Sequence, residues 1–136
     1  MREILFVVGE ASGDLHAGKV AEEIARRRPD IAMAGIGGGF MRTAGVTILE
    51  DVERLAVMGF VEVLAHVPKH WQLLRMLRKR IGAGNVGLVI LLDYPGFNLK
   101  VAEVAHAAGV PVLYYITPQV WAWGADRLPK LARLVT

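Results

Sequence analysis

The chain has 136 residues, of which 54% are hydrophobic, with a net charge of +3 and no cysteine. This length and composition fit one domain with a sizeable core and exclude a disordered chain, a disulfide framework, thiolate zinc sites and thiol catalysis. The sequence shows no signal-peptide pattern and no uncharged apolar run near the ~20 residues that span a bilayer, so we expect a cytoplasmic protein.

Strand and helix patterns alternate along the chain. The strand patterns are short and apolar, and they cover residues 4–8, 31–36, 46–49, 86–92 and 111–116. Helical spacing covers residues 15–28, 57–81 (two pieces broken near Pro68), 97–108 and a stretch from about 126. Turns are expected at 9–14, 37–39 and 82–85. The alternation predicts an α/β fold, a Rossmann-like doubly wound parallel sheet with right-handed crossovers.

The apolar run at 86–92 carries the clearest functional signal, because it ends at Asp93 and is followed by a turn at Pro95-Gly96. Its branched residues predict a strand that is buried on both faces. In open α/β sheets the carboxyl ends of the strands face the ligand crevice. Asp93 is therefore a candidate substrate-site carboxylate, and a plain turn or cap residue is the alternative.

The segment Gly9–Asp14 lies between the first strand and the first helix. Its small residues allow close approach by a ligand, and a helix start offers free N–H groups. The segment is neither a dinucleotide fingerprint nor a P-loop. Glu10 would repel a phosphate, so we expect it to orient a sugar hydroxyl or a polar neighbour. The alternative is turn chemistry, with Ser12 or Asp14 as a plain N-cap.

Residues 63–92 contain five Lys or Arg and no Asp or Glu. Apolar residues, a Trp and interleaved cations are typical of a helix that lies on an anionic membrane surface. The alternative is a core helix with a solvated basic face. We do not expect nucleic acid, because aromatic residues are few and no reader motif is present. The candidate acyl and membrane contacts are Met58, Phe60, Val61, Leu64, Trp71, Leu74, Arg75 and Arg78.

Two further segments are candidate sites. The loop at 117–123 contains two tryptophans, Trp121 and Trp123, which either stack on a sugar or wall an acyl chain, or anchor the loop to the core. The acidic residues at 50–53 have no His nearby, so a solvated loop is expected there and no metal site.

Five motifs occur together in an informative order and spacing. They are Gly9-Glu10-Ala11-Ser12-Gly13-Asp14, the Gly-rich turn at 35–39 with Met41, Ala56-Val57-Met58-Gly59 with Glu62-Val63-Leu64, Asp93-x-Pro95-x-Phe97-Asn98, and Pro118-x-Val120-Trp121-Ala122-Trp123. In this arrangement the chain resembles lipid-A-disaccharide synthases over essentially its whole length. The resemblance implies an inverting glycosyltransferase of the GT-B type. Residues 1–136 would form a single acceptor-side domain, apparently truncated, without the C-terminal nucleotide-sugar domain and inactive alone.

The resemblance also implies the reaction. Diacylated glucosamine would pass from its UDP donor to diacylglucosamine 1-phosphate, giving UDP and tetraacyl disaccharide 1-phosphate, with no cofactor or metal. The enzyme would be peripheral on the cytoplasmic face of the inner membrane of Gram-negative bacteria. Asp93 and Glu10 would be catalytic, with Asp93 as the base. The residues expected to bind the acceptor are Ser12, Gly13, Asn98, Gln119 and Trp121, where Asn98 alternatively holds the Asp93 loop.

Other functional interpretations are considered as well. One is a non-catalytic module that binds a membrane surface or a ligand. A receiver domain is disfavoured, because Glu10 lacks an acidic neighbour and no Lys follows Tyr115 closely. A dinucleotide-dependent oxidoreductase is disfavoured by the missing fingerprint. A cut edge on a truncated domain would expose apolar surface and favour homo-oligomers.

Overall fold

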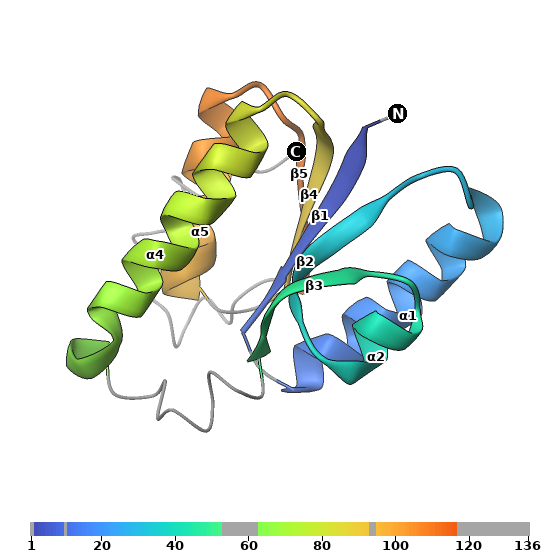
Figure 1. Cartoon of the computed structure of the whole chain (residues 1–136), viewed down its shortest axis with the longest axis horizontal. Coiled ribbons are helices and arrows are strands. Elements are labelled where there is room, and N and C mark those ends of the chain that lie inside the picture. Colours follow the sequence, from blue (N-terminus) through green and yellow to red (C-terminus); the bar gives the residue numbers. More distant parts are fainter. Residues whose placement is uncertain (1, 10, 53–62, 93–94, 117–136) are drawn as a thin grey trace.

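The computed structural model describes residues 2–9, 11–52, 63–92 and 95–116 of the chain (Figure 1). The strands in these residues are β1 (Glu3–Val8), β2 (Met33–Gly37), β3 (Thr47–Asp51), β4 (Val86–Leu92) and β5 (Val112–Ile116). The helices are α1 (Ala11–Arg27), α2 (Gly39–Thr43), α4 (Val63–Gly82) and α5 (Pro95–Ala107). The predicted loop at 117–123 and the predicted helix from 126 lie outside the described residues.

The strands form one five-stranded sheet in the order β3-β2-β1-β4-β5, and all neighbours are parallel. The chain first builds the sheet outward on one side of β1 and then, from β4, on the other side. This reversal creates a topological switch point between β1 and β4, where ligands bind in open α/β sheets. The Rossmann-like doubly wound fold predicted from the sequence is confirmed.

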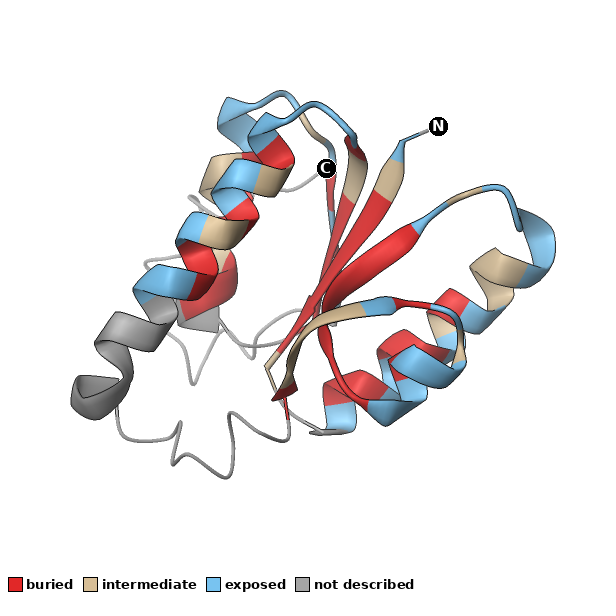
Figure 2. Cartoon of the chain, in the orientation of Figure 1, coloured by how far each residue is buried: buried red, intermediate tan, exposed pale blue. Residues whose placement is uncertain are grey.

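Helices cover both faces of the sheet. Figure 1 shows α1 and α2 on one face and α4 and α5 on the other. In β1, Leu5 and Val7 pack with the α4 and α5 side, while Phe6 and Val8 pack with the α1 and α2 side. Both sets are buried, as the strands in the centre of Figure 2 show. Burial on two faces explains why the strands are continuous apolar runs rather than alternating patterns.

The first helix begins earlier than the sequence predicts. The prediction placed a turn at 9–14 and a helix from Leu15, but α1 begins at Ala11 and includes Ser12, Gly13 and Asp14. These residues have low helix propensity and favour turns. Tertiary contacts override that preference, because the first turn of α1 packs on the sheet and bonds to α2, as described below.

The predicted break near Pro68 is wrong. Helix α4 runs without interruption from Val63 to Gly82 and contains Pro68 close to its N-terminal end. A proline there removes one backbone hydrogen bond, whereas the rest of the helix keeps its bonds and buries Leu77 and Ile81 in the core. The upstream piece predicted from residue 57 lies outside the described residues as far as residue 62.

Helix α2 was not predicted, and the other described elements agree with the prediction to within a few residues. Helix α5 begins at Pro95, because proline at the first helical position lacks only an N–H that has no helical partner. The turn after α5 contains Gly109 at φ 73°, a backbone conformation that favours glycine. The predicted stop after residue 108 and the strand that follows it are therefore confirmed.

Candidate functional site

The candidate site lies at the carboxyl edge of the sheet, at the switch point. The last residues of β1 and β4, Val8 and Leu92, are register partners, so the two strands end side by side. In the sequence, Glu10 follows β1 and Asp93 follows β4 directly. Both lie outside the described residues, so their predicted catalytic roles stay predictions. The same is true of the predicted contacts Met58, Phe60, Val61, Gln119 and Trp121, and of the Leu64 side chain.

The first turn of α1 rests directly on these strand ends. A Cβ atom added to Gly13 would lie 3.1 Å from the Val8 Cβ and 3.9 Å from the Leu92 Cβ. The helix backbone approaches the sheet this closely only because Gly13 has no side chain. Gly13 is buried, whereas Ser12 on the same turn is exposed. Of the two acceptor contacts predicted on this turn, Ser12 is the one whose side chain reaches the surface.

Asn98 approaches the same strand ends from α5. Its side chain is fully buried, with a relative exposure of 0%. The amide Nδ2 donates to the Val7 carbonyl at 3.4 Å and to the Leu92 carbonyl at 3.3 Å. The amide is thus directed at the backbone of both strands. The second predicted role of Asn98, holding the Asp93 loop, stays a prediction, because Asp93 lies outside the described residues.

Asp14 has a role that the sequence analysis did not identify. Its carboxylate is buried, and Oδ1 accepts hydrogen bonds from the backbone N–H groups of Gly38 at 2.8 Å and Met41 at 3.0 Å. Oδ2 accepts from the N–H of Phe40 at 3.0 Å. Asp14 therefore caps the start of α2 instead of its own helix. It fixes the Gly-rich turn after β2 to the first turn of α1.

No local sequence signal points to this contact, because the partners lie in a distant turn. Gly38, the N-cap residue of α2, has no side chain with which to cap that helix. The only available hint is that two turns rich in small residues follow neighbouring parallel strands. Such turns meet at one edge of the sheet, so an acidic residue in one can bond to the free N–H groups of the other.

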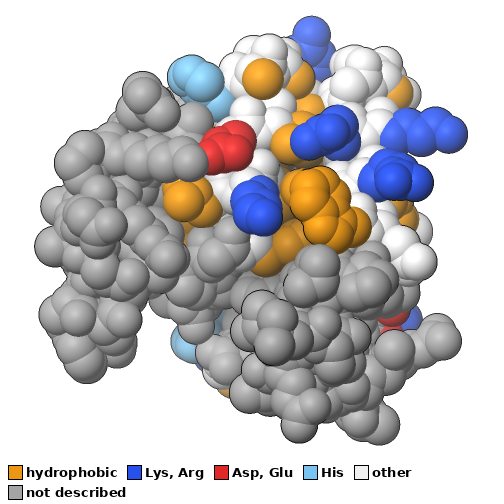
Figure 3. Space-filling model, turned by 90° about the vertical axis from the view of Figure 1, so that its left-hand side faces the viewer, with side chains coloured by type: hydrophobic (Ala, Val, Ile, Leu, Met, Phe, Trp, Pro, Cys, Tyr) orange, Lys and Arg blue, Asp and Glu red, His pale blue; other side chains and the backbone are white. Residues whose placement is uncertain are grey.

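The outer surface of α4 and α5 carries the predicted membrane contacts that the structure describes. Trp71 is 55% exposed, and the Lys100 ammonium lies 5.5 Å from the centre of its ring. A groove of about 610 Å³ runs between the helices, lined by Trp71, Leu74, Arg78 and Lys100 among others. Figure 3 shows Lys and Arg side chains around apolar side chains on this face.

The four predicted membrane contacts with described side chains differ in exposure. Trp71, Arg75 and Arg78 are exposed, whereas Leu74 is only 6% exposed and belongs to the core between α4, α5 and the sheet. Leu74 forms part of the groove floor. The exposed set is thus one aromatic ring with cations around it, a composition typical of an interfacial surface.

Further observations limit the kinds of site in the described part of the chain. Its His, Asp and Glu side chains form no group of three or more that could hold a metal ion. In the acidic region at 50–53, Asp51 lies 3.7 Å from the Arg42 guanidinium. Among the described helices, none combines the length and apolar character that crossing a bilayer requires.

The fold and the switch-point geometry define a Rossmann-like α/β domain. Residues 4–136 match the family model of lipid-A-disaccharide synthetase, and the chain belongs to that family. It is 48% identical over 98% of its length to the lipid-A-disaccharide synthase of Geobacter metallireducens, covering 35% of that protein. It is 42% identical over 97% of its length to the synthase of Myxococcus xanthus, covering 34%. The chain spans about a third of the length of these curated relatives.

Proposed function

We propose that the chain forms the acceptor-side domain of an inverting glycosyltransferase of lipid A biosynthesis. The observation that carries the proposal is family membership over residues 4–136, joined to a switch point where β1 and β4 end together. The reaction would transfer diacylated glucosamine from its UDP donor to diacylglucosamine 1-phosphate. The products would be UDP and tetraacyl disaccharide 1-phosphate.

Asp93 is the proposed general base. As the acceptor hydroxyl oxygen attacks the anomeric carbon, its proton passes to the Asp93 carboxylate. The new bond from carbon to oxygen forms while the bond to UDP breaks, and UDP leaves with the electron pair. Attack from the face opposite UDP inverts the anomeric centre. The position of Asp93 in the chain, directly after the last residue of β4, supports this role.

Glu10 and Ser12 are proposed to orient the acceptor. Glu10 follows β1 in the sequence as Asp93 follows β4, and the last residues of these two strands are register partners, which supports a shared role. Ser12 is exposed on the first turn of α1 at the same edge. Gln119 and Trp121, which follow β5 in the sequence, are proposed to complete the acceptor site.

The outer surface of α4 and α5 is proposed to bind the anionic membrane that holds both lipid substrates. The exposed Trp71 ring, flanked by Arg75 and Arg78, supports this role. Each cation near an anionic leaflet contributes about 1 kcal/mol. The protein would then work as a peripheral enzyme at the cytoplasmic face of the inner membrane.

The partner of this domain is proposed to be a nucleotide-sugar domain. The relatives are about three times as long as the chain, since the chain covers 35% of the Geobacter metallireducens synthase. In a GT-B enzyme the second domain would supply most UDP contacts. We therefore expect the chain alone to bind acceptor and membrane but to lack turnover.

Binding of the chain to nanodiscs, with and without diacylglucosamine 1-phosphate, tests this division. We expect acceptor-dependent binding together with weak affinity for UDP, titrated in parallel. Tight UDP binding with no response to the lipid would contradict the acceptor-side assignment. Binding to anionic nanodiscs that the acceptor does not change would favour a non-catalytic membrane-surface module.

The base is tested in a synthase of the relatives' length that begins with this chain, called here the full-length synthase. Asp93→Asn should lower kcat by about 10²-fold to 10⁴-fold, because the variant cannot accept the hydroxyl proton. Asp30→Asn, at an exposed aspartate after α1, is the matched control and should leave kcat unchanged. Full activity of Asp93→Asn would remove Asp93 from the mechanism.

The membrane surface is tested by reversing charges. The double variant Arg75→Glu and Arg78→Glu should weaken binding to vesicles rich in anionic lipid by 10-fold or more, on the order of 1 kcal/mol per cation. The control is Arg26→Glu with Arg27→Glu, a pair of exposed arginines on α1, which covers the opposite face of the sheet from α4. Equal loss in both variants would show a general charge effect instead of a defined surface.

A further inference from the structure

Two residues that the sequence analysis placed in the acceptor site, Gly13 and Asn98, are buried against the sheet. We propose that they are positioning residues that together clamp the ends of β1 and β4. The clamp fixes the spacing between the last residues of the two strands, which Glu10 and Asp93 follow in the sequence. The inference rests on the proposed function, in which Asp93 is the base and Glu10 orients the acceptor.

The two contacts come from opposite faces of the sheet. Gly13 belongs to α1 and packs against Val8 and Leu92, whose side chains belong to the core on the α1 and α2 side. Asn98 belongs to α5, which lies on the other face in Figure 1. Leu92 is held from both sides, since its Cβ faces Gly13 and its carbonyl accepts from Asn98.

The chemistry of the Asn98 side chain suits this role. One Nδ2 atom carries two hydrogens, and here it donates to one carbonyl in β1 and to one in β4. A leucine has no donor and an ionised aspartate has none either, so neither can join the two strands. Val7 is the second-to-last residue of β1 and Leu92 is the last residue of β4. The two bonds therefore join the strands where their regular ladder of hydrogen bonds ends.

A clamp of this kind affects turnover more than binding. When catalytic groups are displaced by about 1 Å, rates fall by about 10²-fold although the substrates still bind. An acceptor contact behaves differently, because its loss raises KM for the acceptor. The division of an effect between kcat and KM therefore separates the two roles of Asn98.

Asn98→Leu in the full-length synthase is the first test. We expect kcat to fall by about 10²-fold with KM for the acceptor changed less than about threefold. Asn85→Leu, at the other asparagine of the chain, is the control, because Asn85 is exposed at the opposite end of β4. A raised acceptor KM with unchanged kcat would overturn the proposal, as would wild-type kinetics.

Asn98→Asp adds a readout that a loss of stability would not produce. An ionised carboxylate opposes both carbonyls, whereas a protonated one donates to one of them. Burial raises the pKa of such a carboxyl, so the ratio of variant to wild-type kcat should increase as the pH falls. The ratio for Asn85→Asp should stay flat. A flat ratio for Asn98→Asp would contradict the clamp.

Hydrogen exchange tests the clamp without relying on transferase activity. In Asn98→Leu, backbone amides at the carboxyl ends of β1 and β4 should exchange faster, while those at the amino ends keep their rates. A wild-type full-length synthase without transferase activity would contradict the proposed function, and the clamp would still be supported if its Asn98→Leu variant showed this exchange pattern. Unchanged exchange at both ends would contradict the clamp itself. Gly13→Ala should show a smaller increase, because a Cβ at 3.1 Å requires only a small shift of Val8.

Discussion

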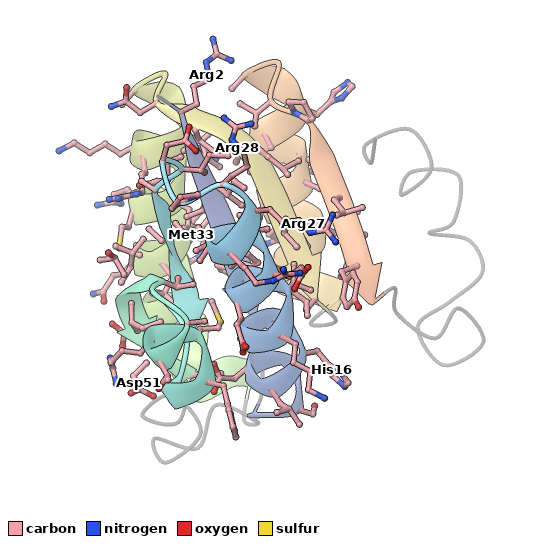
Figure 4. All side chains as sticks on the ribbon, turned by 90° about the vertical axis from the view of Figure 1, so that its right-hand side faces the viewer. Arg2, His16, Arg27, Arg28, Met33 and Asp51 are labelled. Carbon is pink, nitrogen blue, oxygen red and sulfur yellow. The ribbon has the colours of Figure 1, made fainter. Side chains whose placement is uncertain are left out.

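The two edges of the sheet use polar side chains in different ways. At the carboxyl edge, the buried side chains of Asp14 and Asn98 bond to backbone groups of other elements. At the amino edge, Glu3 at the start of β1 and Arg80 near the end of α4 form two bonds of 2.7 Å between charged groups. Figure 4 shows His16 and Asp51 towards the first edge and Arg2 and Arg28 towards the second.

This difference predicts that the two edges respond differently when a side-chain bond is lost. Buried bonds to backbone groups fix the course of the chain, and each leaves an unsatisfied group when it is lost. A partly exposed ion pair joins two elements, but solvation by water and screening by salt weaken the interaction. The carboxyl edge, where the proposed catalytic residues follow their strands, should therefore be the more sensitive to substitution.

The largest expected effect on stability belongs to Asp14. Asp14→Ala removes the acceptor of three backbone N–H groups at the start of α2. We expect a loss of about 3 kcal/mol or more in the free energy of unfolding, because bonds to a charged group contribute about 1.5–3 kcal/mol each and are not additive. Urea denaturation of the chain measures this.

Asp14→Asn sharpens this result. Its side-chain oxygen can replace Oδ1, which accepts two of the three bonds, but its NH₂ group would face the N–H of Phe40. The loss should be smaller than that of Asp14→Ala. Asp30→Ala, at an exposed aspartate, serves as the control and should leave the denaturation midpoint unchanged. Equal behaviour of Asp14→Ala and Asp30→Ala would contradict the capping role.

A smaller effect is expected at the amino edge. A double-mutant cycle with Glu3→Gln and Arg80→Met should give a coupling free energy of about 1 kcal/mol, because the pair is bidentate and partly buried. A hydrogen bond to the Glu3 carboxylate raises the pKa of Arg80 above its ordinary value. Stability gained through a raised pKa is present below the unfolded value, so the contribution of Arg80 should stay constant between pH 6 and 9. A coupling larger than the loss in Asp14→Ala would invert the comparison.

The smallest effect is expected away from both edges, at Glu23 on α1. Hydrogen bonds from Arg26 and Arg27 lower the pKa of Glu23. Any stability from this shift is present above the unfolded pKa and is lost as the pH falls through the lowered value. Glu23 is half-exposed and its partners are more so, so Glu23→Gln should leave the thermal midpoint at pH 7 unchanged. A clear drop would mean that exposed pairs matter here as much as buried ones.

The sequence predicted the features that depend on local patterns. The run at 86–92 became β4 with the predicted bounds, and the glycines at 84 and 109 mark the turns before β4 and β5. These elements are predicted correctly because a strand that is buried on both faces and a turn at positive φ each restrict the residue types at their own positions.

The features that the sequence missed depend on distant partners. The early start of α1 and the capping of α2 both involve Asp14, whose bonds reach residues 38–41. The continuity of α4 through Pro68 depends on packing further along that helix. In the candidate site, the edge was predictable, but the burial of Gly13 and Asn98 was not, because it requires knowing that two helices from opposite faces meet the same strand ends.

The place of β1 in the sheet also has a consequence for how the protein reaches its structure. β1 is made before the other described strands, yet one of its neighbours is β4, with Ile4 paired to Leu88 more than half the chain away. Such non-local pairing slows folding, because the entropy of closing a long loop is lost before the contacts between the strands stabilise the structure. During synthesis one side of the apolar strand β1 therefore stays unpaired until β4 has been made. The growing chain is consequently most prone to aggregation before the carboxyl edge of the sheet is complete.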